Sequence, residues 1–76
     1  MTSNVVLEVI ERIDRLISEE EGDIFNSLAR IEQLRFNIML SSKNKAIAIN
    51  NLKRRIASSK RKIVDLKARK TIISVS

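Results

Sequence analysis

The chain contains no cysteine, histidine, proline, tryptophan or tyrosine, and only one glycine and two phenylalanines among its 76 residues. Without cysteine and histidine, disulfides and most transition-metal sites are excluded. Without proline, and with a single glycine, the sequence has no repeated interruptions of helical structure. Because so short a chain buries only a small core, we expect it to gain stability by self-association or by binding another protein.

The missing residue types also argue against an enzyme. Histidine, cysteine and tyrosine are common catalytic bases, nucleophiles and acids, and no glycine-rich phosphate-binding loop is present. The acidic residues Glu19, Glu20, Glu21 and Asp23 would point to different sides of a helix, so we interpret them as solvated surface rather than a cation site. We therefore expect no catalytic residue, no metal and no cofactor.

Isoleucines recur every seven residues through the first half of the chain, as in a helix that packs against another helix. The pattern runs through Gly22 without a shift, so we expect one helix to continue through this glycine. A glycine inside a helix lowers stability by about 1 kcal/mol relative to alanine. The repeating residues are Ile10, Ile17, Ile24, Ile31 and Ile38.

A second heptad pattern follows near the C-terminus. Its first apolar position is always isoleucine, and the position three residues later is leucine or serine. Basic residues occupy both flanks, so two copies lying in parallel would repel each other. The apolar positions are Ile49, Leu52, Ile56, Ser59, Ile63 and Leu66.

The polar segment from Ser41 to Lys45 separates the two patterns, and the heptad register breaks across it. We predict an all-α fold, an antiparallel two-helix coiled-coil hairpin that dimerises into a four-helix bundle. The single domain 1–76 would hold a helix at about 5–41, a turn at about 42–46 and a helix at about 47–72. The alternatives are a single long helical coiled coil and a three-helix bundle.

Two antiparallel registers fit both heptad patterns. The first sets Glu20 against Lys70, the two charged residues of the seam, and brings Ile38 into the seam. The second lies one heptad away and sets Glu20 against Ile63 and Lys70 against Ile13, which is costly unless both charges reach water. We therefore predict the first register, with an ion pair between Glu20 and Lys70.

A second apolar row on the first helix indicates a further interface, because a helix with two apolar faces needs more than one neighbour. The matching row on the second helix is small and would allow close approach of another helix. We expect dimerisation through these rows. The first comprises Phe25, Ala29, Phe36 and Leu40, and the second comprises Ala46, Ala57, Val64 and Ala68.

Charge divides the chain unevenly. Residues 1–42 hold eight acidic and four basic side chains, a net −4, whereas residues 43–76 hold eleven basic and one acidic, a net +10. The basic residues could bind phosphates or complement the acidic helix. Base readout is not expected without tyrosine or tryptophan. The candidate phosphate-binding residues are Lys53, Arg54, Arg55, Lys60, Arg61, Lys62, Lys67 and Arg69.

These patterns predict a non-enzymatic structural or adaptor protein that acts through helix–helix association. Its expected partner is itself, as a homodimer or higher oligomer, or another helical protein. The alternative is a small basic helical protein that contacts the phosphate backbone of DNA or RNA. We see no signal peptide and no apolar run of roughly 20 residues, so we expect a soluble, cytoplasmic protein. A membrane is the less favoured partner, because the apolar seam of the basic helix is already used for pairing.

Overall fold

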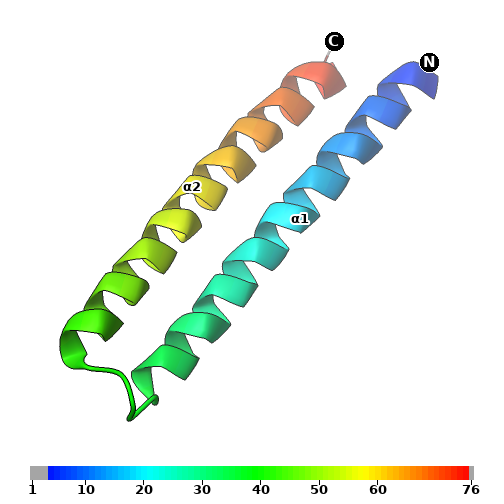
Figure 1. The fold of residues 1–76 in the computed structure, drawn as a ribbon. Coiled ribbons are helices and arrows are strands. Elements are labelled where there is room, and N and C mark those ends of the chain that lie inside the picture. Colours follow the sequence, from blue (N-terminus) through cyan, green and yellow to red (C-terminus); the bar gives the residue numbers. More distant parts are fainter. Residues whose placement is uncertain (1–3, 76) are drawn as a thin grey trace.

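A computed structural model describes residues 4–75 as two long helices that lie side by side. Helix α1 spans Asn4–Arg35 and helix α2 spans Ser42–Val75, and the start of α1 lies at the same end of the hairpin as the end of α2 (Figure 1). The Cα atoms extend over 59 × 14 × 11 Å. The predicted all-α antiparallel hairpin is confirmed. The alternatives of one continuous helix and of a three-helix bundle are wrong, because the described residues form two helices that reverse direction and pack against each other.

Gly22 lies inside α1, so the prediction that one helix continues through it is confirmed. No described glycine has a positive φ, so this position does not require glycine for its backbone conformation. A Cβ atom added at Gly22 would meet nothing within 4 Å. The glycine therefore weakens the helix without serving a turn or a close packing contact.

The loop between the helices spans residues 36–41, earlier than the predicted turn at about 42–46. Side chains of two loop residues explain this position. The Met39 backbone N–H donates to Asn37 Oδ1 over 2.9 Å, a local turn that competes with further helix after Arg35. The Asn44 N–H donates to Ser41 Oγ over 3.2 Å, so Ser41 caps α2. The segment predicted to turn therefore forms the first turn of α2.

The core is one line of side chains between the helices. Ile31 and Leu34 are the most buried apolar residues, with 5% and 4% of their surface exposed, and no described side chain is completely enclosed. Such limited burial agrees with the expectation for a short chain. The buried residues are Ile13, Ile17, Ser27, Ile31, Leu34, Ile56 and Ser59.

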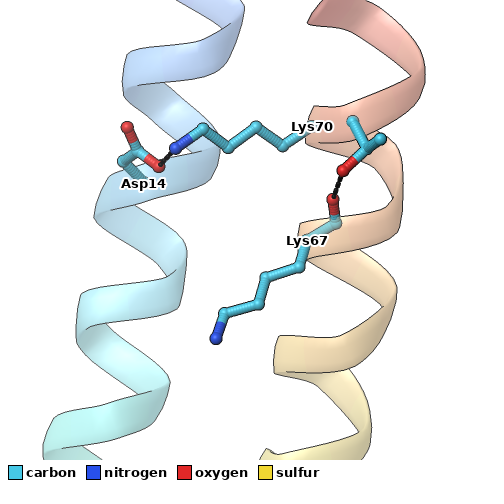
Figure 2. A network of polar contacts seen from close by, with 4 residues as sticks. Asp14, Lys67 and Lys70 are labelled. Carbon is cyan, nitrogen blue, oxygen red and sulfur yellow. Dashed lines mark hydrogen bonds and ion pairs between the residues drawn. The ribbon is translucent and has the colours of Figure 1, made fainter.

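The predicted ion pair between Glu20 and Lys70 is wrong. Glu20 Oε1 instead lies 3.7 Å from Lys62 Nζ, and Lys70 Nζ donates to Asp14 Oδ1 over 2.7 Å (Figure 2). These contacts fit the register that lies one heptad from the predicted one. Ile38, which the predicted register placed in the seam, lies in the loop with 92% of its surface exposed.

Two causes explain the observed register. First, α1 ends at Arg35, so the helix needed to carry Ile38 into the seam is absent. Second, each charged seam residue has an oppositely charged neighbour on the facing helix, Lys62 for Glu20 and Asp14 for Lys70. These pairs offset part of the penalty for placing a charge opposite isoleucine, although one oxygen of Glu20 stays buried without a hydrogen-bond partner.

Candidate interaction surfaces

The predicted apolar row of α1 does not form one helical face. Phe25 and Ala29 are exposed on α1, whereas Phe36 and Leu40 lie in the loop beyond the end of the helix. The row assumed a helix to about residue 41, and the turn at Asn37 separates its two parts. The exposed apolar residues therefore belong to two surfaces, one on the side of α1 and one at the tip of the hairpin.

A continuous stripe on α1 includes Phe25 and steps alternately by four and three residues, so its members share one face. Phe25 is 72% exposed and Leu28 is 51% exposed. Acidic residues lie on both sides of this apolar pair. The stripe comprises Glu11, Asp14, Ser18, Glu21, Phe25, Leu28 and Glu32, and every member is exposed.

A matching stripe on α2 alternates basic and small apolar or polar residues. Figure 2 shows the Lys67 side chain on the same side of the hairpin as the Asp14–Lys70 bond. The two stripes therefore lie next to each other, and together we call them the mixed-charge face. The α2 stripe comprises Lys53, Ala57, Lys60, Val64, Lys67 and Thr71, and every member is exposed.

The opposite side of the hairpin is hollowed along the helix junction. Near the chain ends, Val9, Leu16 and Ile73 help to line an open, largely apolar hollow of about 360 Å³. Nearer the loop, a separate shallow hollow is lined by Asp23, Arg30 and Arg55. We call this side the groove side. Its surface combines apolar residues with charges of both signs from both helices.

All eight candidate phosphate-binding residues lie on α2 and are exposed. Within the described residues, Lys62 is the member of this group that forms an ion pair, with Glu20. The group covers the outer surface of α2 and both of its flanks, because its members follow one another at successive positions of the helix. Arg55 lines the same hollow as Asp23 and Arg30 of α1, an arrangement that the sequence did not predict.

The loop presents three large apolar side chains to solvent. Phe36 is 79% exposed, Ile38 is 92% exposed and Met39 is 88% exposed. This cluster was not predicted from the sequence, because its residues were assigned to the first helix. The signal that could have revealed it was Asn37, whose side chain often closes a local turn.

Leu28 was also missed as a surface residue. Its spacing of three from Phe25 and four from Glu32 would have placed it in the α1 stripe, had the stripe been traced from the acidic residues.

Compared with known proteins, the chain matches no family model, no curated protein and no solved structure. Within residues 4–75, no helix is both long enough and apolar enough to span a membrane.

Proposed function

We propose that this protein is a non-enzymatic structural or adaptor hairpin that acts through helix–helix association, with a second copy of the chain as its partner. One observation carries the proposal, which is the complementary character of the two stripes on the mixed-charge face. The α1 stripe is acidic with large apolar residues at its centre, and the α2 stripe is basic with small residues between its lysines. Another helical protein would need to offer the same pattern.

Turning a second copy by 180° about an axis parallel to the helices would set each α1 stripe on the partner's α2 stripe. The Glu20–Lys62 contact fixes which residues lie at the same level of the hairpin. At that level, Phe25 of each copy meets Ala57 of the other, a large side chain against a small one. Glu21 likewise approaches Lys60 of the other copy. The product would be a four-helix bundle with all chain ends at one end.

Other pairings are less favourable. A two-fold axis perpendicular to the helices would place the acidic α1 stripe of one copy on the α1 stripe of the other. The carboxylates of the two stripes would then repel each other. The groove side carries charges of both signs on each helix, so pairing through it would set like charges as well as opposite charges against each other. The mixed-charge face is therefore the surface whose charges suit a second copy.

The proposal is tested by sedimentation equilibrium of the full chain. We expect a mass of twice 8.7 kDa for the natural sequence. Phe25→Asp should weaken the dimer at least ten-fold, because truncated aromatic anchors commonly cost 2 kcal/mol or more. Val5→Asp, at an exposed position outside the mixed-charge face, is the matched control. A folded monomer whose melting temperature does not depend on concentration would contradict the proposal.

The second candidate function is binding to the phosphate backbone of duplex DNA or RNA. It is favoured by the exposure of the eight basic residues on α2. Among the described residues, Lys62 is the one of these eight that pairs with an acidic side chain, so the other seven keep their charge for a partner. Such binding would be electrostatic and would follow the backbone without reading bases.

A fluorescence titration with labelled duplex at several salt concentrations tests this candidate. Arg54→Glu together with Arg61→Glu should weaken binding and reduce the salt dependence, because both residues lie on the outer surface of α2. Arg12→Glu and Arg15→Glu on α1 change net charge equally and serve as the control. Equal losses in both double variants would indicate a nonspecific effect of net charge and contradict a site on α2.

A further inference from the structure

The net charge of the protein is concentrated in the half of the hairpin that contains the loop. We define the closed half as residues 24–58 and the open half as residues 4–23 with 59–75. The closed half holds seven basic side chains and one acidic, a net +6, whereas the open half holds eight of each. The hairpin therefore has one neutral end and one strongly positive end.

The positive end is also the apolar end. Phe36, Ile38 and Met39 project from the loop, each more than three-quarters exposed. Arg35, Lys43 and Lys45 lie beside them at the ends of the two helices. We call these six residues the tip. An apolar cluster bordered by basic side chains is the composition that suits an interface between anionic headgroups and acyl chains.

We propose that the tip binds end-on to the surface of an anionic lipid bilayer. Phe36, Ile38 and Met39 enter the boundary between headgroups and acyl chains, and the basic residues of the tip contact lipid phosphates. Insertion stops at this boundary, because the irregular loop backbone is not stable in the hydrocarbon interior. This binding does not rest on the proposed self-association, although that pairing would place two tips at the same end.

The apolar side chains favour lipid over nucleic acid at the tip, since both ligands are anionic and charge does not distinguish them. Nucleic-acid backbones would be contacted by the lysines and arginines of α2 and would leave the apolar cluster in water. Asn37, the polar side chain within the cluster, already accepts a hydrogen bond from Met39. The sequence-based argument against a membrane concerned the seam of the basic helix, and the tip does not use that seam.

The test uses the absence of tryptophan from the chain, which makes one introduced tryptophan a clean reporter. Phe36→Trp reports on the tip, and Val5→Trp reports on the side of α1 outside the mixed-charge face, where the valine is similarly exposed. Each variant is titrated with vesicles of pure phosphatidylcholine and with vesicles containing about 30% phosphatidylserine. Duplex DNA is titrated in parallel.

We expect the emission of Phe36→Trp to shift to shorter wavelength with the anionic vesicles, and that of Val5→Trp to stay unchanged. A shift in both variants would mean that the hairpin lies flat, and a shift in neither would mean no insertion. A shift of Phe36→Trp with DNA alone would identify the tip as a nucleic-acid wedge. Each of these three results would overturn the proposal.

A second pair of variants separates insertion from simple charge attraction. Ile38→Ser with Met39→Ser should lower affinity for the anionic vesicles roughly ten-fold or more, because apolar burial is lost. Lys43→Ala should lower it about five-fold. Circular dichroism should show an unchanged hairpin in both, since these side chains are exposed. Undiminished binding of the serine variant would overturn the proposal.

Discussion

The closed and open halves of the hairpin hold their two helices together by different interactions. The closed half buries Ile31, Leu34 and Ile56 although it carries the whole net charge. Within the described chain, both ion pairs between the helices, at Asp14 and at Glu20, lie in the open half. The comparison indicates that apolar burial holds the closed half against its own charge repulsion, while the open half adds exposed charge pairs to a weaker seam.

Removing the core of the closed half should have the largest effect on stability. Leu34 is the most buried apolar residue, and Leu34→Ala is expected to cost about 2–5 kcal/mol of unfolding free energy. Urea unfolding followed by circular dichroism measures this. Ile38→Ala, in the exposed loop, is the control and should change stability by less than about 0.5 kcal/mol. Equal losses for both variants would contradict the assignment of Ile38 to the loop.

Replacing the charged seam residue should strengthen the open half. Glu20 Oε2 is buried without a hydrogen-bond partner, and the side chain is only 18% exposed. Glu20→Leu should therefore raise stability by about 1 kcal/mol, because it removes a desolvated oxygen and adds apolar burial. Glu19→Leu, at an exposed neighbouring position, should have little effect in the same urea experiment. A large loss of stability in Glu20→Leu would mean that the ion pair with Lys62 matters more than the burial.

Gly22→Ala should strengthen the open half by a smaller amount. The added methyl group meets no neighbour, and the backbone does not require glycine. The expected gain is about 0.5–1 kcal/mol, from the smaller loss of backbone entropy on folding. Thermal unfolding measures it. A lower melting temperature would indicate that another molecule approaches the backbone closely at this position, for example in an assembly.

The smallest effect is expected at the ion pair of the open half. The side chains of Lys70 and Asp14 are 39% and 49% exposed, so water and salt weaken their attraction. Lys70→Ala should cost no more than about 0.5 kcal/mol, and the difference should shrink in high salt. Lys67→Ala controls for the general effect of losing a lysine. A cost above 2 kcal/mol would mean that this pair, rather than the apolar seam, holds the open half.

The fold could be predicted from the sequence because the seven-residue repeat identifies the two helices even where their ends are placed a few residues wrong. The isoleucine repeat predicted one helix through Gly22, and the polar break together with the basic flanks of the second heptad pattern predicted the reversal of the chain. The position of the loop was harder to predict, because it depends on local hydrogen bonds of Asn37 and Ser41 that compete with helix. Both heptad registers have the same spacing, so periodicity could not separate them.

The candidate surfaces were only partly predictable for the same reason. Phe25 and the basic residues of α2 were placed correctly on exposed helix faces, because helical spacing determines their positions. Phe36 was assigned to the same face as Phe25, and that assignment failed once α1 ended at Arg35. The apolar tip and the grouping of charge in the closed half depend on where the chain turns, which the spacing alone did not reveal.

The most direct test of the central proposal is cross-linking between single-cysteine chains, which is possible because the natural sequence lacks cysteine. In the proposed dimer, residue 18 of one copy lies at the level of residue 64 of the other. Mixing Ser18→Cys with Val64→Cys under mild oxidation should therefore give a mixed dimer, and Ala68→Cys, outside the mixed-charge face, should not join it. Cross-linking of Ser18→Cys mainly to itself would contradict the proposed pairing, and no cross-link above the Ala68→Cys control would contradict the dimer on this face.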